Sequence, residues 1–166
     1  QVLTQYVEIM EIRFEGRLHV ETHVDAAVLD ALVPNLILQP LVENAIKHGV
    51  SKLPSAATGR VEVAARRDDD MVVITVRDNG PTLADSSTLV PSGVGLRNTR
   101  ARLAQLYGPE HTLVLEPVGG GEGGVIATLT LPYHTRADLH VSAVDPTAPE
   151  VEATAASGAS MPAGLV

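Results

Sequence analysis

The fold is decided by the stretch 39-QPLVENAIKHG-49, in which apolar and polar residues recur with the period of an α-helix. An apolar stripe at i, i+3, i+4, i+7 and i+8 is typical of a helix that packs on a core. The stripe consists of Leu38, Leu41, Val42, Ala45 and Ile46. Pro40 suits the first turn, and Gly49 suits a left-handed residue that ends the helix. The pattern predicts one short helix.

The polar residues of this helix are Glu43, Asn44, Lys47 and His48. Residues four apart lie on successive turns, so Glu43 is expected near Lys47 and Asn44 near His48. An acid, an amide oxygen and two basic groups in one place would suit a metal ion with a phosphate. The alternative is a solvated helix face, on which the Glu43–Lys47 pair adds only about 0.3 kcal/mol.

Length and composition predict one globular domain. The chain has 166 residues, of which 45% are hydrophobic, and its three Tyr, one Phe and no Trp leave the core to aliphatic side chains. A net charge of −8 without a dense basic stripe argues against a nucleic-acid partner. The absence of cysteine fits a reducing compartment. No apolar run reaches the length of a spanning helix or signal peptide, so we expect a cytoplasmic domain.

Helices and strands are expected in a mixed order. Residues 2–14 have helical spacing and begin without a capping residue, so we expect the helix to continue upstream of Gln1. Period-two alternation and turn signals predict strands over residues 17–24, 60–66, 71–77, 112–116 and 125–131. Residues 134–166 have the composition of a flexible tail. Because strands and helices do not alternate regularly, the fold class is predicted as α+β.

Asp78 is a candidate binding residue. It shares strand parity with Val72, Ile74 and Val76, so its side chain should point towards the core. A buried carboxylate needs a donor, and an amino group on a planar heterocycle would supply one. In the alternative, Asp78 only begins a turn with Asn79-Gly80 and bonds nearby backbone N–H groups.

The stretch Gly93-Val94-Gly95 is predicted to open a second helix, with Leu96, Leu103, Leu106 and Tyr107 on its core side. Such a turn lets the backbone approach a phosphate, and the helix start offers unpaired N–H groups. Arg97 and Arg100 lie one turn further along. An ordinary loop-to-helix turn is the alternative.

An amide-bearing helix, an inward-facing Asp at the end of a strand and a glycine turn that opens a second helix, in this order, are the parts of an ATP site. Asn44 would hold Mg²⁺ through its amide oxygen, the ion would bridge the phosphates, and Lys47 would offset phosphate charge.

The chain resembles the Bergerat-fold ATP-binding domains of gyrase, MutL and histidine kinases, and more narrowly the catalytic domain of the autolysin-regulator type of sensor histidine kinase. Residues 38–49 are similar to the N box of that subfamily, and Asp78-Asn79-Gly80 to the box whose Asp binds the adenine amino group. Residues 93–98, with Arg102-Leu103 and Tyr107-Gly108, resemble the second glycine box and its helix. Residues 6–14 look like the end of a dimerisation helix.

The resemblance implies a two-layer α/β sandwich with a mixed, mostly antiparallel sheet and helices on one face. It implies ATP and Mg²⁺ as cofactors, Asn44 as metal ligand, and Glu43, Asn44 and Lys47 as the catalytic group. The implied nucleotide contacts are Asn44, Lys47, His48, Asp78, Gly80, Gly93, Val94, Gly95 and Leu96. The implied domains are 1–15, the helix end, 16–133, the ATP-binding domain, and 134–166, the tail.

The implied function is transfer of the ATP γ-phosphate to a His on a helix upstream of Gln1, and from there to an Asp of a response regulator. Its implied partners are ATP, its own dimerisation and phosphoacceptor domain, the regulator and a second copy of the kinase, which can be anchored in the inner membrane. None of the six His here lies in an acceptor box, and His19 and His23 are expected to be exposed structural residues.

Two departures from the family pattern concern the adenine pocket. Thr82 stands where a second Gly is common, and Gly124-Val125 stands where Gly-Thr is common. Two other functions remain open at this stage: a nucleotide-binding regulatory module of the anti-sigma type that docks on a protein, and a dimerisation remnant that binds nothing.

Overall fold

The computed structural model describes residues 8–9, 12–14, 16–34, 36–81, 94–119, 123–135 and 138. Residues 8, 9, 12 and 13 are helical, in agreement with the helix expected near the start of the chain. Gly93 and Thr82 lie outside the described residues, as does most of the expected tail. In the part that is described, no helix is long and apolar enough to cross a membrane.

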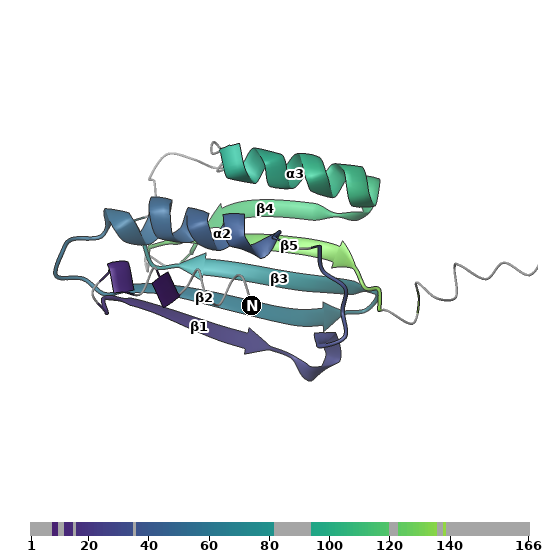
Figure 1. The fold of residues 1–166 in the computed structure, drawn as a ribbon, viewed down its shortest axis with the longest axis horizontal. Coiled ribbons are helices and arrows are strands. Elements are labelled where there is room, and N and C mark those ends of the chain that lie inside the picture. The colour runs from purple at the N-terminus through teal and green to yellow at the C-terminus, as the bar shows by residue number, and fades with distance from the viewer. Residues whose placement is uncertain are drawn as a thin grey trace, which may run out of the picture.

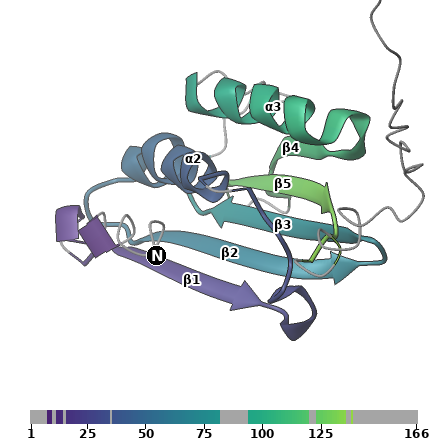
Figure 2. The same ribbon diagram turned by 45° about the vertical axis from the view of Figure 1, so that its right-hand side comes forward.

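A five-stranded mixed sheet forms one layer (Figures 1 and 2). Its strands are β1 (Leu18–Val24), β2 (Gly59–Asp68), β3 (Met71–Asp78), β4 (Thr112–Pro117) and β5 (Val125–Pro132). The spatial order is β1-β2-β3-β5-β4, with β1 parallel to β2 and every other pairing antiparallel. The prediction of a mixed, mostly antiparallel sheet is confirmed.

The central strands follow the predicted alternation. On β3, Ile74 lies opposite Ala65 of β2 and Leu129 of β5, and Ile74 and Leu129 are both buried. β1 departs from the prediction: Leu18 is buried, but Val24 at its other end is 47% exposed. β1 is an edge strand, and α2 lies over the central strands rather than over it (Figure 2). Its His19 and His23 are exposed, as predicted.

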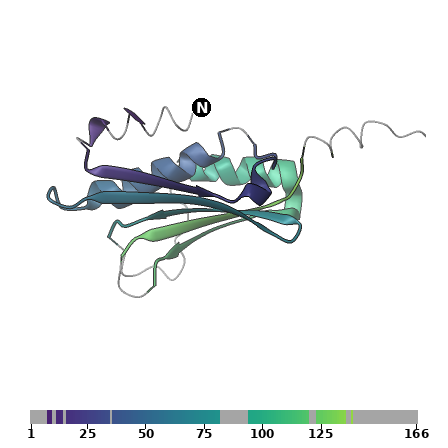
Figure 3. The same ribbon diagram turned by 90° about the horizontal axis from the view of Figure 1, so that it is seen from below.

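The second layer consists of α2 (Leu38–Asn44) and α3 (Val94–Tyr107), which pack on the same face of the sheet (Figures 1 and 3). The predicted core side of α3 is partly wrong. Its buried residues are Leu96, Thr99 and Leu103, whereas Leu106 is 54% exposed. Residue 106 lies about 80° away from Leu96 around an ideal helix, at the margin of the stripe, and Thr99 takes the inner position.

The helix of residues 38–49 does not end in a left-handed glycine. After Asn44 it widens into a π-helical turn, Ala45–Gly49, and continues as a 3₁₀ turn, Val50–Lys52. Gly49 has φ −94° and ψ −87°, so the prediction of a left-handed cap is wrong. π-helical turns within α-helices are frequent at functional sites.

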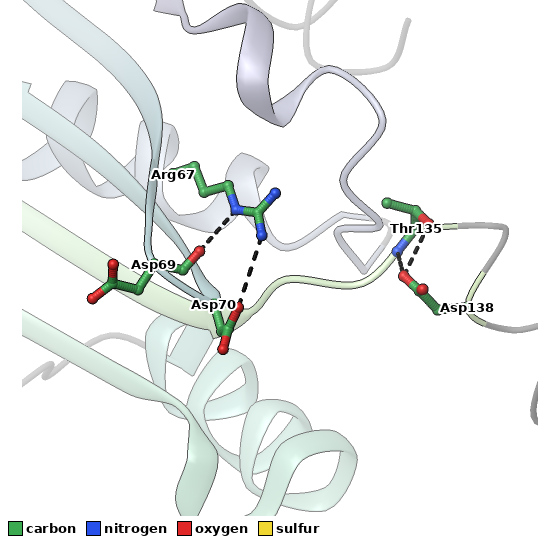
Figure 4. A network of polar contacts seen from close by, with 5 residues as sticks. All are labelled: Arg67, Asp69, Asp70, Thr135 and Asp138. Carbon is green, nitrogen blue, oxygen red and sulfur yellow. Dashed lines mark hydrogen bonds and ion pairs between the residues drawn. The ribbon is translucent and has the colours of Figure 1, made fainter.

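At the end of the sheet far from Asp78, polar contacts gather around Arg67 (Figure 4). Its Nε donates to the Asp69 carbonyl at 2.8 Å, and its guanidinium lies 3.8 Å from the Asp70 carboxylate and 4.0 Å from the centre of the Tyr133 ring. The Tyr133 N–H donates to the Asp70 carbonyl at 2.8 Å. The β2–β3 turn is thereby joined to the segment that leaves β5.

Candidate functional site

Asp78 ends β3 on the helix-covered side of the sheet and is only 4% exposed. Its Oδ1 accepts a hydrogen bond from the Gly80 N–H at 2.8 Å. Burial raises the pKa of the Asp78 carboxyl above its ordinary value, and backbone hydrogen bonds from Gly80 and Val125 oppose that rise. Asp78 therefore points inward and also begins a turn, so the two interpretations of its role are compatible.

Three glycines surround Asp78 at distances that leave no room for a side chain. A Cβ on Gly49 would overlap the Asp78 carboxyl group, and one on Gly80 would overlap the Gly49 backbone. A Cβ on Gly124 would overlap the main-chain carbonyl of Asp78. The end of the π turn, the turn after β3 and the start of β5 thus meet at one carboxyl group. This approach, rather than a helix cap, accounts for the glycine at position 49.

The polar face of α2 is ordered around Glu43. Its Oε1 accepts a hydrogen bond from Gln39 Nε2 at 2.9 Å, and its Oε2 accepts one from Lys47 Nζ at 3.1 Å. The Gln39 hydrogen bond lowers the pKa of the Glu43 carboxyl below its ordinary value, partial burial opposes this, and the bond and charge of Lys47 lower it further. The predicted Glu43–Lys47 pair is present.

Asn44, the expected metal ligand, is half-buried, and its side chain makes no hydrogen bond with any other described residue. In the described structure no side-chain hydrogen bond joins Asn44 to His48, which is exposed. An amide oxygen without a partner among the described side chains suits a hard cation that keeps most of its waters. Asn44 therefore fits the Mg²⁺ role that the resemblance implies.

The start of α3 lies against the first turn of α2. A Cβ on Gly95 would lie 3.7 Å from Cβ of Pro40, and Leu96 is buried, whereas Val94 and Gly95 are exposed. The described part of the expected phosphate turn is therefore brought next to the helix that carries Glu43 and Asn44. Arg100 donates to the Leu113 carbonyl at 2.8 Å and so joins α3 to β4.

Asn79 has a role that the sequence did not reveal. Its Oδ1 accepts from the Arg60 N–H at 2.7 Å, and its Nδ2 donates to the Thr58 carbonyl at 3.0 Å. The side chain thus ties the end of β3 to the start of β2. An Asn-Gly pair after a strand predicts a turn, but its partners lie 19 and 21 residues away in the chain and carry no local signal.

A hollow of about 460 Å³ lies at this end of the sheet and is lined in part by Arg60, Glu62 and Arg77. Glu62 and Arg77 are opposite each other on β2 and β3 and alternate with the inward-facing Val61, Val63 and Val76. The hollow therefore opens on the face away from α2. Asp78, Asn79 and Gly123 also line it, so it borders the cluster around Asp78.

Comparison with known proteins identifies related sequences. Residues 30–135 match the family described as "Histidine kinase-, DNA gyrase B-, and HSP90-like ATPase". The chain is 31% identical over 145 residues to the sensor protein LytS of Staphylococcus haemolyticus, and 32% over 134 residues to the sensor histidine kinase BtsS of Escherichia coli K12. It is 33% identical over 134 residues to the sensor histidine kinase YesM of Bacillus subtilis. The alignments cover 81%, 80% and 79% of this chain but 24%, 22% and 22% of those relatives.

Solved structures share the fold. The mycobacterial sensor histidine kinase MprB has a TM-score of 0.56 at 16% identity, covering 81% of this chain and 93% of that one. The blue-light activated histidine kinase EL346 of Erythrobacter litoralis has a TM-score of 0.55 at 20% identity, covering 79% and 40%. At these identities the likeness establishes the two-layer architecture and nothing further.

Proposed function

Because the chain belongs to the histidine kinase-, DNA gyrase B- and HSP90-like ATPase family, we propose that it is the catalytic ATP-binding domain of a bacterial two-component sensor histidine kinase. The relatives at 31–33% identity that carry the names sensor protein or sensor histidine kinase support this function over a docking module. The chain spans about a quarter of the length of these relatives. The other activities of a complete sensor kinase would lie in segments outside this chain.

One observation carries the proposal: the buried Asp78 carboxyl is in contact with Gly49, at the end of the helical stretch that begins with α2 and carries Asn44. Asp78 would accept a hydrogen bond from the adenine amino group, which replaces the water that burial excludes. Asn44 lies five residues before Gly49, about one turn away in the π-helical segment. The adenine ring and the phosphates of one nucleotide would then lie along this helical stretch.

The remaining roles follow from charge and position. Mg²⁺, held by Asn44, would neutralise phosphate charge when bound. Lys47 and His48 would face the phosphates together with the backbone N–H groups of residues 93–96, and Gly80 would lie under the purine. Phosphoryl transfer depends mainly on positioning and charge stabilisation, so these groups can supply most of what is required. Glu43 would orient the acceptor imidazole or accept its proton.

The partners lie outside the chain. We expect an acceptor His in a dimerisation segment that precedes residues 1–15, a homodimeric kinase, and phosphoryl transfer to an Asp of a response regulator. One structural neighbour, ThkA, has been solved in complex with the response regulator TrrA, with a TM-score of 0.52 at 18% identity. We assign residues 16–133 to the ATP-binding domain and 134–166 to a tail.

Calorimetric titration with Mg²⁺ and a non-hydrolysable ATP analogue tests this function. The parent chain should bind, and Asp78→Asn should lose tenfold or more in affinity, since a hydrogen bond to a charged group contributes about 1.5–3 kcal/mol. Asn44→Ala should weaken binding only when Mg²⁺ is present. Gln105→Ala, at an exposed position on α3 outside the glycine-box stretch, is the control. A parent chain without affinity for the nucleotide would refute the assignment.

A further inference from the structure

The geometry at the end of β3 requires an asparagine followed by a glycine. Gly80 is buried, and a Cβ there would overlap the Gly49 backbone. The Asn79 side chain accepts from the Arg60 N–H at 2.7 Å and donates to the Thr58 carbonyl at 3.0 Å. A carboxylate could accept but not donate, so both bonds need the amide. Two independent contacts thus place Asn and Gly side by side.

An Asn-Gly pair is chemically labile, because asparagine is a thermolabile residue and glycine has no side chain to block attack by its own nitrogen. The main-chain nitrogen of the glycine, after losing its proton to water or hydroxide, can attack the side-chain carbonyl carbon of the asparagine. The new C–N bond closes a succinimide ring, and the side-chain nitrogen leaves with a proton as ammonia. Water then opens the ring at either carbonyl carbon, which gives aspartate or isoaspartate and returns a proton to the glycine nitrogen. Water is the only reagent consumed.

Both reacting groups are engaged in the folded domain. The Gly80 N–H donates to Asp78 Oδ1 at 2.8 Å, so the proton that must leave is held by a carboxyl oxygen at a buried position. The attack would expel Asn79 Nδ2 and turn the side-chain carbonyl towards Gly80, so the bonds to Thr58 and Arg60 would both be lost. The reaction therefore requires this end of the sheet to open locally.

Either product would disturb the surroundings of Asp78. Aspartate would place an oxygen where Nδ2 now faces the Thr58 carbonyl, and two acceptors cannot form a hydrogen bond. Isoaspartate would lengthen the main chain by one carbon just before Gly80, which already lies against the Gly49 backbone. Both changes act on the turn that holds Asp78 in place.

We propose that Asn79 is a latent deamidation site: it is inert while the Asp78 end of the sheet is folded, it reacts with water when that end opens, and the product binds nucleotide weakly. The last part rests on the proposed function, whereas the first two parts concern the folded chain alone. Bound nucleotide keeps Asp78 and Gly80 in place, so an occupied domain deamidates more slowly than an empty one.

The first test is peptide mapping by mass spectrometry after incubation in mildly alkaline buffer, which measures aspartate and isoaspartate at position 79. In the folded parent chain, Asn79 should react at least roughly tenfold more slowly than in the same chain unfolded in urea. Asp78→Ala removes the acceptor of the Gly80 N–H and should speed the reaction severalfold in a chain that circular dichroism shows to be folded. Asn98, exposed on α3, is the internal reference, and Asp78→Ala should leave its rate unchanged.

Two results of this test would overturn the proposal. One is an equal rate at Asn79 in the folded and the unfolded parent, which would mean that its hydrogen bonds give no protection. The other is an Asn79 that stays intact in the unfolded chain, which would mean that the pair is not labile.

The second test is calorimetry of Asn79→Asp, which carries the carboxylate of the product, with Mg²⁺ and a non-hydrolysable ATP analogue. Its affinity should be about tenfold lower than that of the parent, since a hydrogen bond at the Asp78 turn is lost. Gln105→Glu makes the same change from amide to carboxylate at an exposed position on α3 and should keep the parental affinity. Equal affinity of Asn79→Asp and the parent would overturn the claim that the product is impaired.

The third test joins the two measurements. At an analogue concentration 100 times the dissociation constant, the open fraction falls about a hundredfold, so deamidation of the parent should slow by tenfold or more. An analogue that binds but leaves the rate unchanged would overturn the link between nucleotide and protection. A parent chain that binds no nucleotide would refute the proposed function, while the folded and unfolded rates would still decide whether Asn79 is a protected site.

Discussion

Position 49 shows how a single missing side chain can set the geometry of a site. Gly49 is buried and has a negative φ, so backbone freedom is not the reason for glycine here. The reason is the carboxyl group of Asp78, which occupies the space that a Cβ would need. The residue on the helix and the residue on the strand therefore depend on each other.

We expect Gly49→Ala to weaken ATP-analogue binding by tenfold or more and to destabilise the domain by about 1–3 kcal/mol, the usual cost of overpacking. Calorimetry and urea unfolding measure the two effects. Gly119→Ala is the control, because a Cβ there would meet nothing within 4 Å. Equal affinity in Gly49→Ala and the parent would mean that Asp78 does not need this space.

Asp78 should make the stability of the nucleotide-free domain depend on pH. Its pKa is raised by burial, so the folded state holds the proton more tightly than the unfolded chain does. The Asp78 contribution is then fully present below the ordinary Asp pKa of about 3.9 and is lost as pH rises through the raised value.

Asp78→Asn removes that titration. The free energy of unfolding of Asp78→Asn minus that of the parent should therefore increase as pH rises above about 4, whatever the offset between them at low pH. Urea unfolding at a series of pH values measures the difference. A difference that stays constant from acid to neutral pH contradicts the prediction.

Among the secondary-structure elements, those with a repeating pattern were predictable. The alternation in β2 and β3 and the apolar stripe of α2 report burial directly, and the structure has them where expected. The π turn after Asn44 was not predictable, because it depends on how closely Gly49 approaches β3. Leu106 was misplaced because it lies at the margin of the buried stripe, where hydrophobicity alone does not decide burial.

The candidate site was also predictable only in part. Asp78 and the Glu43–Lys47 pair followed from strand parity and helical spacing. Gln39 and Asn79 were missed because amide side chains take their roles from partners that a sequence pattern does not identify.

The Asn79 side chain should stabilise the connection between the end of β3 and the start of β2, beside the backbone bonds of the sheet. We expect Asn79→Ala to lower the free energy of unfolding by about 1–2 kcal/mol, because two side-chain hydrogen bonds of roughly 1 kcal/mol each are lost. Asn98→Ala, on the exposed surface of α3, should change it by less than about 0.5 kcal/mol. Urea unfolding measures both free energies, and equal effects of the two substitutions would contradict the prediction.

The domain as a whole should be stabilised by its ligand. At a free Mg·ATP concentration 100 times the dissociation constant, binding adds about 2.7 kcal/mol, which for a chain of 166 residues raises Tm by roughly 5–10 °C. Removal of Mg²⁺ with EDTA should reduce the shift in the parent. It should reduce it less in Asn44→Ala, where the metal ligand is already missing. Equal sensitivity of the two proteins to EDTA would argue against Asn44 as that ligand.

The position of β5 has a consequence for synthesis of the protein. β5 is the last strand that the structure describes, yet it lies between β3 and β4, and Gly124 just before it lies against the backbone of Asp78. A nascent chain on the ribosome cannot close the purine side of the pocket until residues 124–132 have emerged. Until then, nucleotide cannot stabilise the partly folded chain. One edge of β3 stays without a hydrogen-bonded partner, so chaperones or other chains can bind to it.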